Sequence, residues 1–302
     1  METHLVPGAR FVDPKVLARI KDLELLARTV VDGFINGLHR APYFGASIDF
    51  AEHRGYVPGD DIRRVDWRLY ARTDRYFVKQ YEADTNANFA VLLDQSKSMA
   101  FGSHGVTKIE YAKFVAACLA YLSHRQRDRV GIVSFDHEIV AHVPPSAKHF
   151  NVLLHTLDRA KPERPGRLLA MLSNIAEHFK RRSIVALISD LYENPEDILE
   201  ALKPYAYLGN DLVVFHVLDP AEITFPYRDA SRFMDLESGE EIPVVPEAFA
   251  EQYRKMIREH IESLRTKCSE SRIDYVLLDT SKPLDEALFS YLGNRERLKR
   301  VR

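Results

Sequence analysis

The sequence predicts an α/β fold built around a doubly wound, mostly parallel β-sheet. Strand-like runs alternate with helical stretches along most of the chain, which favours right-handed βαβ units. Several of the strand-like runs are continuously apolar, as is typical of strands that are buried on both faces. With 302 residues, 46% of them hydrophobic, the chain can bury the core of one large domain or two modest ones.

The elements of this sheet are read from the apolar pattern. The predicted strands are short, strand-like runs and cover residues 89–94, 129–135, 183–190, 211–218 and 273–279. The helices predicted between most of them cover residues 108–127, 168–179, 195–208 and 246–271. Residues 138–143 are expected to return as an antiparallel edge strand that ends at Pro144 and Pro145. The run FMDLESGEEIPVV, within residues 221–246, predicts a small hairpin insertion that turns at Ser238 and Gly239.

The N-terminal part of the chain has a different character. Apolar residues recur at intervals of three and four between residues 14 and 38, which predicts one amphipathic helix that begins at Asp13 and Pro14. Residues 41–88 are rich in Gly, Pro, aromatic and charged residues and predict loops and a short strand. We therefore expect residues 1–85 to form a helix followed by a strand and loop segment, and residues 86–302 to form the sheet domain.

Charge and cysteine content exclude several classes of protein. The chain has 42 Lys and Arg against 44 Asp and Glu, so no general positive field attracts it to nucleic acid or anionic lipid. Its two cysteines, Cys118 and Cys268, lie in helical runs and are expected to be free, buried thiols. No stretch has the apolar length of a signal peptide or of a membrane-spanning helix. We expect a cytoplasmic protein with no membrane insertion and no nucleic-acid partner.

Short polar residues follow the first strand of the predicted sheet. Asp94, Ser96 and Ser98 come directly after an apolar run, and Asp190 follows the run SIVALIS. Ligands of open α/β sheets bind at the carboxyl ends of the strands, so these side chains could converge on one Mg²⁺ that keeps a coordination position open. Such a site suits the capture of a carboxylate from a partner protein. The alternative is that these residues only cap the following turns.

Enzymatic motifs are absent from the sequence. It contains no G-x-S-x-G, no G-x-x-x-x-G-K-[ST] and no H-E-x-x-H, so neither a catalytic residue nor a nucleotide site is predicted. The favoured interpretation is a non-enzymatic protein-interaction adaptor. The alternative function is a metal-dependent hydrolase that uses the same strand-end carboxylates.

A long motif resembles a known bacterial family. It comprises Arg54-Gly55-Tyr56, Pro58-Gly59-Asp60-Asp61-Ile62-Arg63, Asp66-Trp67, Tyr70-Ala71-Arg72-Thr73 and Val78-Lys79-Gln80-Tyr81-Glu82, and it continues at Leu93-Asp94, Ser96, Ser98-Met99, Lys108-Ile109-Glu110-Tyr111-Ala112-Lys113 and Asp128-Arg129-Val130-Gly131-Ile132-Val133. The stretch from about residue 40 to 220 is similar to the bacterial domain-of-unknown-function family 58. The resemblance implies a von Willebrand factor A-like, Rossmann-like fold with a metal-ion-dependent adhesion site. It also implies a soluble adaptor that works with a MoxR-type AAA+ ATPase in complex assembly or chaperone-like maturation.

One loop departs from the pattern that the resemblance implies. Sites of this kind use a loop threonine, whereas this chain reads Arg164-Pro165-Gly166-Arg167-Leu168. If Arg167 lies beside Asp94 and Asp190, its guanidinium would replace the charge of the metal.

The segment around the Gly-Asp-Asp motif has two interpretations. Its arginines can brace the N-terminal segment through internal ion pairs, or its outer residues can form part of a protein interface, because Arg, Trp and Tyr are enriched in binding hot spots. The candidate partner-binding residues are Arg63, Arg64, Trp67, Arg68, Tyr70 and Arg72.

Overall fold

A six-stranded sheet forms the centre of the protein in a computed structural model. The structure describes residues 13–40, 52–56, 67–80, 87–179, 182–228, 231–244, 246–285, 287–289 and 291. The strand order is β10-β7-β6-β3-β4-β5, and every neighbouring pair is parallel except β4 and β5. The six strands are β3 (Asn88–Asp94), β4 (Arg129–Phe135), β5 (Ile139–Ser146), β6 (Ser183–Ser189), β7 (Asp211–Leu218) and β10 (Asp274–Asp279). The predicted doubly wound, mostly parallel α/β fold is confirmed.

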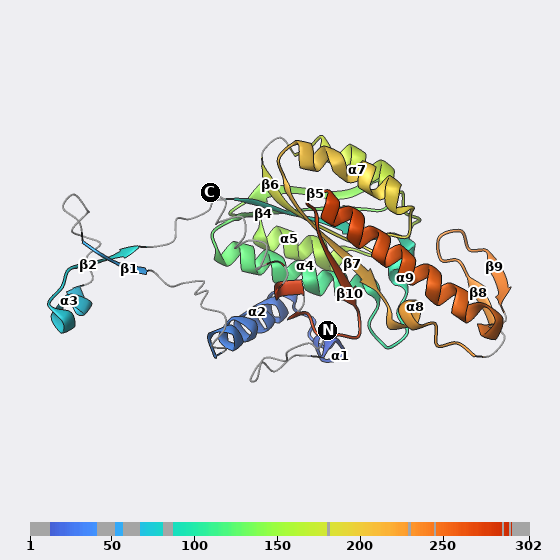
Figure 1. Cartoon of the computed structure of the whole chain (residues 1–302), viewed down its shortest axis with the longest axis horizontal. Helices are drawn as coiled ribbons and strands as arrows, with labels where there is room; N and C mark the ends of the chain where they lie inside the picture. The colour runs from blue at the N-terminus through green and yellow to red at the C-terminus, as the bar shows by residue number, and fades with distance from the viewer. Residues whose placement is uncertain are drawn as a thin grey trace.

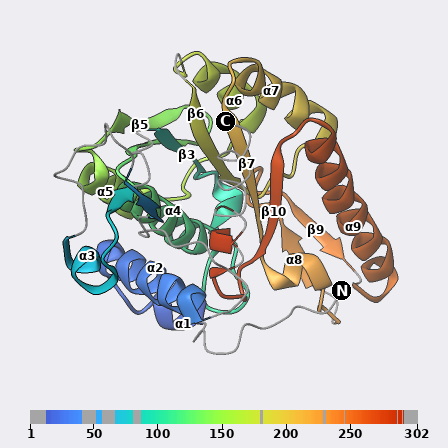
Figure 2. The ribbon, with the colours of Figure 1, turned by 60° about the vertical axis from the view of Figure 1, so that its left-hand side comes forward.

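Helices cover both faces of this sheet (Figures 1 and 2). The helices on one face share a hydrophobic cluster with the sheet and are α2 (Leu23–Arg40), α4 (Lys108–Arg125) and α5 (Phe150–Arg159). The helices on the other face share a second cluster and are α6 (Leu168–Ala176), α7 (Pro195–Tyr207) and α9 (Pro246–Glu270). The central strand supplies both clusters: Phe89, Val91 and Leu93 belong to the first, and Ala90 and Leu92 to the second. This explains why the strand is apolar without alternation.

Shorter elements complete the described chain. They are α1 (Pro14–Leu17), β1 (Glu52–Gly55), α3 (Trp67–Thr73), β2 (Phe77–Gln80), the 3₁₀ turn η2 (Lys97–Ala100), α8 (Pro220–Thr224), β8 (Ser231–Met234) and β9 (Glu241–Val244). Strands β1 and β2 form an antiparallel pair. Strands β8 and β9 form the predicted hairpin, with Gly239 in the left-handed conformation at φ 78°. Gly239 therefore takes the backbone angle that the turn requires.

Several boundaries differ from the sequence predictions. A single helix was predicted over residues 14–38, but the structure has two helices, α1 and α2, in this range. Asp22 caps the start of α2, because its side chain accepts hydrogen bonds from the backbone N–H groups of Glu24 (2.8 Å) and Leu25 (3.1 Å). Helices α3 and α5 were not predicted, although α5 buries residues at helical spacing. The edge strand β5 continues through its two prolines, which an edge strand tolerates because one side needs no N–H donor.

The order of the strands reverses around β3. The chain passes from β3 to β4 on one side and then returns to place β6 on the other side. In open α/β sheets, such a switch point leaves a crevice at the carboxyl ends of the two strands. Asp94 ends β3 and Asp190 follows β6, so the fold places both predicted carboxylates at this point.

Two smaller observations concern the predicted thiols and membrane association. Cys118 and Cys268 are both free and buried, as predicted. Within the described part of the chain, none of the helices combines the length and the apolar character that a membrane span needs.

Gly131 offers a test of the packing at the sheet edge. A Cβ at this residue would lie 2.6 Å from the carbonyl oxygen of Val143 and 2.7 Å from the nitrogen of Pro145, where β5 bulges against β4. We expect Gly131→Ala to lower the free energy of unfolding by about 1–3 kcal/mol, because the contacts are with backbone atoms that cannot move aside freely. Urea denaturation measures the change.

The control is Gly33→Ala in α2, where a Cβ meets nothing within 4 Å. This variant should gain up to about 1 kcal/mol from helix propensity. Equal unfolding free energies for the two variants would contradict the packing that we describe at Gly131.

Candidate functional site at the carboxyl end of the central strands

Asp94 is the buried acid at the centre of the site. It is 4% exposed, and its carboxylate accepts hydrogen bonds from the backbone N–H of Ser96 (2.9 Å) and from the hydroxyl of Ser189 (2.6 Å). Burial, and after it the negative charge of Asp190, raises the pKa of Asp94 to about 7. None of the described basic side chains donates a hydrogen bond to Asp94, so the charge of this acid is incompletely compensated.

The two predicted serines lie beside this acid. The Ser96 and Ser98 hydroxyl oxygens are 3.1 Å apart. Their loop is attached to the loop before α6: Ser96 forms a parallel bridge with Arg164, whose carbonyl accepts a hydrogen bond from the N–H of Lys97 (2.8 Å). A Cβ at Gly166 would lie 2.6 Å from the Ser96 Cβ, so only glycine permits this approach. The two loops form one surface above Asp94.

Asp190 is paired with a lysine that the sequence analysis did not select. The Lys108 ammonium donates to Asp190 (2.7 Å) and to Glu222 of α8 (2.8 Å), and it is fully buried. Burial lowers the pKa of Lys108, but the two carboxylates more than offset this and leave the pKa above its ordinary value. The ring of Tyr192 lies 4.7 Å from the same ammonium. Lys108 therefore forms ion pairs with Asp190 and Glu222 but not with Asp94.

The sequence left open whether Arg167 lies beside Asp94 and Asp190. The loop before α6 contacts the loop that carries Ser96, but the Arg167 side chain is exposed and its backbone N–H donates to the carbonyl of Asp136 (3.2 Å). Arg164, two residues before Gly166, pairs with Asp136 (2.9 Å) and with Glu138. The cation that contacts a predicted ligand is Lys108, which reaches the site because it begins α4 directly after the capping residue Thr107.

A carboxylate from the hairpin lies on the surface formed by the two loops. Glu237 accepts hydrogen bonds from the backbone N–H of Ser98 (2.7 Å) through one oxygen and from the backbone N–H of Gly166 (2.8 Å) through the other. Glu237 belongs to the turn between β8 and β9, and it lies 139 residues from Ser98 in the sequence. The site can thus bind a carboxylate with both oxygens through main-chain donors alone.

Negative charge exceeds positive charge around the site. The charge of Asp190 raises the pKa of Asp94, and burial, with added repulsion from Asp190 and Glu237, raises the pKa of Glu193. Among the described residues, no group of three or more His, Cys, Asp or Glu side chains converges to hold a metal. A cation would therefore need the serine hydroxyls as ligands, and Asp94, Ser96 and Ser98 are the hard oxygen donors that Mg²⁺ prefers.

The sequence analysis missed the residues that complete the site. Lys108 lay within the motif quoted for the family resemblance, and Gly166 lay in the loop that departs from the family pattern. Spacing alone does not indicate a buried ion pair or a close loop contact. Glu237 lay in the run that predicted the hairpin, and no sequence signal places it on the loops. Glu222 gave a local signal, because with Asp219 it forms a capping box at the start of α8.

The candidate partner-binding residues lie away from these contacts or outside the described residues. Arg63 and Arg64 fall outside the described residues, and of Arg68 only the backbone is described. Trp67 is 55% exposed, and Arg72 is exposed. Tyr70 stacks on Tyr76 with a ring distance of 4.5 Å, in the short segment between β1 and β2. Their use in an interface stays a prediction.

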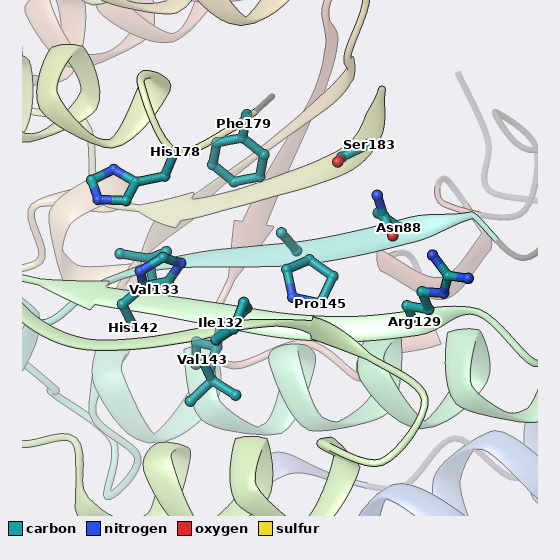
Figure 3. Close-up of a pocket in the computed structure, with 12 residues that line it drawn as sticks. Asn88, Arg129, Ile132, Val133, His142, Val143, Pro145, His178, Phe179 and Ser183 are labelled. Atoms are coloured by element: carbon teal, nitrogen blue, oxygen red, sulfur yellow. The ribbon is translucent and has the colours of Figure 1, made fainter. Parts of the chain in front are cut away.

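A cavity lies at the opposite end of the strands from Asp94. It has a volume of about 270 Å³, and its lining includes Asn88, Arg129 and Ser183, which begin β3, β4 and β6 (Figure 3). The rings of His142 and His178 lie edge to face, 4.9 Å apart, on its wall. Burial, with the neighbouring His178, lowers the pKa of His142. This cavity contains none of the predicted site residues.

Known proteins are similar to this chain over most of its length. The model of the family described as "Protein of unknown function DUF58" matches residues 52–263. The chain is 29% identical over 233 residues to the "Uncharacterized protein Rv1480" of Mycobacterium tuberculosis, covering 75% of this chain and 73% of that protein.

Solved structures are similar at lower identity. An aerotolerance-related membrane protein from Bacteroides fragilis matches 70% of this chain and 99% of its own, with 18% identity and a TM-score of 0.47. The SpRpn10 VWA domain matches 68% of this chain and 94% of its own, with 11% identity and a TM-score of 0.42.

Removal of the buried Lys108 ammonium should destabilise the folded protein. We expect Lys108→Met to lower the free energy of unfolding by about 3–5 kcal/mol, because Asp190 and Glu222 then remain buried without their cation. Urea denaturation at pH 7 measures the loss. Adding Asp190→Asn and Glu222→Gln to Lys108→Met should recover most of it, and a triple variant as unstable as the single one would contradict the ion-pair explanation.

The raised pKa of Asp94 predicts a pH-dependent gain in stability for Asp94→Asn. The folded-state pKa of about 7 exceeds the ordinary value of 3.8, so the folded protein holds the proton more tightly. The wild-type protein therefore loses stability as the pH rises from about 4 through 7, by an amount on the order of a few kcal/mol.

Asp94→Asn lacks this titration. Its melting temperature in EDTA, relative to that of the wild type, should rise between pH 5 and pH 8. A difference between the two proteins that is independent of pH would show that Asp94 is not desolvated as described.

Proposed function

This chain belongs to the DUF58 family, and we propose that it is a non-enzymatic adaptor that binds a carboxylate of a partner protein at the Asp94 site. The proposed site comprises the side chains of Asp94, Ser96 and Ser98 and the main-chain donors of Ser98 and Gly166. It resembles a metal-ion-dependent adhesion site in its position at the carboxyl ends of β3 and β6.

One observation carries this proposal. Two backbone N–H groups, at Ser98 in the loop after Asp94 and at Gly166 in a separate loop, hold the two oxygens of one carboxylate at 2.7 and 2.8 Å. Main-chain donors fixed by loop geometry are suited to recognise a carboxylate, because they need not be ordered when it binds. The alternative interpretation, in which the strand-end residues only cap turns, does not explain why a second loop supplies an N–H donor to the same carboxylate.

Mg²⁺ is the cofactor that we propose for this site. Asp94, Ser96 and Ser98 would hold it, with Asp190 contributing through the oxygen that does not contact Lys108. When bound, the cation would supply positive charge that attracts an incoming carboxylate. The excess of negative charge around Asp94 supports this assignment.

A MoxR-type AAA+ ATPase is the partner that we propose, and the family resemblance of the motif supports it. In such a complex, the ATPase would supply the energy and this chain would supply recognition. The arrangement would serve complex assembly or the maturation of a client protein.

The test of the adaptor function is capture of the ATPase with purified wild-type and Asp94→Ala protein. We expect Asp94→Ala to reduce capture at least tenfold while the far-UV circular dichroism stays unchanged. Millimolar Mg²⁺ should raise the melting temperature of the wild type but not of the variant, because a ligand stabilises only the protein that binds it.

Asp211→Ala is the matched control, because Asp211 begins β7 at the opposite end of the sheet. It should behave like the wild type in both assays. Equal capture by Asp94→Ala and the wild type would refute the proposed site. Turnover of phosphoester substrates that disappears with EDTA would instead favour the hydrolase that the sequence left as an alternative.

A further inference from the structure

The hairpin between β8 and β9 occupies the carboxylate-binding surface of the same chain. We infer that Glu237 is an internal ligand of the site, and that the external partner is a protein segment with an acidic tight turn, which must displace the hairpin tip to bind. This inference rests on the proposed function, since it names the chemistry of the partner that the site accepts.

The hairpin tip is ordered by its own hydrogen bonds. Asp235 accepts hydrogen bonds from the backbone N–H of Glu237 (2.8 Å) and from the hydroxyl of Ser238 (2.9 Å). The backbone N–H of Asp235 donates to the carbonyl of Glu240 (2.9 Å), and that of Gly239 donates to the carbonyl of Asp235 (2.8 Å). The turn therefore presents the Glu237 carboxylate in a fixed position, which reduces the entropy cost of its binding.

The base of the hairpin is attached independently of the site. Phe233 stacks on Phe225, with ring centroids 5.7 Å apart, and meets Tyr227 edge to face at 5.0 Å. Met234 and Glu241 are the last residues paired across the hairpin. The six residues between them form the tip that reaches the loops. Removal of the tip can therefore leave the base in place.

The contacts of the tip indicate what a partner must offer. Glu237 supplies a carboxylate to the N–H groups of Ser98 and Gly166. Asp235, two residues earlier, is stabilised in its charged form first by the Glu237 N–H and the Ser238 hydroxyl, which lower its pKa, and the charge of Lys97 adds to this effect. A partner turn with two acids at this spacing would reproduce both interactions.

The tethered tip competes strongly with an external ligand. Because the ordered tip is part of the same chain, its effective concentration at the site is on the order of millimolar or higher, so an isolated acidic peptide of weak affinity cannot displace it. Binding of the partner would then depend on additional contacts, or on a local concentration high enough to overcome the competition. Loss of the tip should expose the site.

The first experiment tests the internal contact by amide hydrogen exchange at Ser98 and Gly166. In Glu237→Ala both amides should exchange at least fivefold faster than in the wild type, because they lose their acceptor. Glu240→Ala is the matched control, since Glu240 is an exposed acid of the same tip whose side chain forms no hydrogen bond with the described residues of the site. Unchanged exchange in Glu237→Ala would overturn the inference.

The second experiment tests competition with a defined probe. The probe is a fluorescein-labelled peptide of residues 231–244, closed by a disulfide between added terminal cysteines. Fluorescence anisotropy measures its binding to three proteins: the wild type, Glu237→Ala and a tip-shortened chain. In the tip-shortened chain, Asn-Gly replaces residues 235–240 and forms a two-residue turn between the paired strand ends. Both variants should bind at least tenfold more tightly than the wild type, and a probe with Gln at the Glu237 position should not bind.

The outcomes separate this inference from the proposed function. Equal affinity of the probe for all three proteins, or equal binding of the Gln probe, overturns the internal-ligand inference. ATPase capture that depends on Asp94 but does not increase in the tip-shortened chain also overturns it, and leaves the proposed function intact. Tighter probe binding by both variants, without any ATPase capture that depends on Asp94, supports the internal ligand and refutes the proposed function.

Discussion

The ion cluster of Lys108, Asp190 and Glu222 is the interaction on which the architecture of the site depends. It joins the start of α4, the loop after β6 and the helix α8, three segments that are far apart in the sequence. A fully buried ammonium that contacts two carboxylates at 2.7 and 2.8 Å is tolerated only because each charge has a partner. This cluster holds Asp190 next to β3, where its negative charge also acts on Asp94.

Asp94 differs from Asp190 in this respect. Its carboxylate accepts hydrogen bonds from a backbone N–H and a hydroxyl, which orient it but do not neutralise it. The low polarity of the buried site makes this imbalance costly, which is why the pKa rises to about 7. The site thus combines Asp190, whose charge is paired with Lys108, with Asp94, whose charge can be balanced by a cation, by a proton or by a rearranged neighbouring group. This combination suits a binding site whose occupancy changes.

The two loops above Asp94 connect this electrostatic arrangement to recognition. Their contact requires glycine at residue 166, because a side chain there would overlap Ser96. The contact aligns two N–H donors that belong to different parts of the chain, and the hairpin places an acid on them. A rigid surface made of main-chain donors recognises the chemical group and not the identity of the residue that carries it. An internal acid and an external acid can therefore use the same surface.

The sequence by itself determined the sheet, most of its helices, the hairpin and the strand-end positions of Asp94, Ser96, Ser98 and Asp190, because apolar periodicity and turn residues are local signals. The family resemblance implied that the loop before α6 approaches the site. Only the tertiary structure decided which cation pairs with Asp190. Arg167 was the candidate that the sequence offered, but Lys108 is the residue that α4 directs into the site. The contact of Glu237 with Ser98 likewise joins residues 139 positions apart, and neither residue type nor spacing specifies such a pairing until the chain is folded.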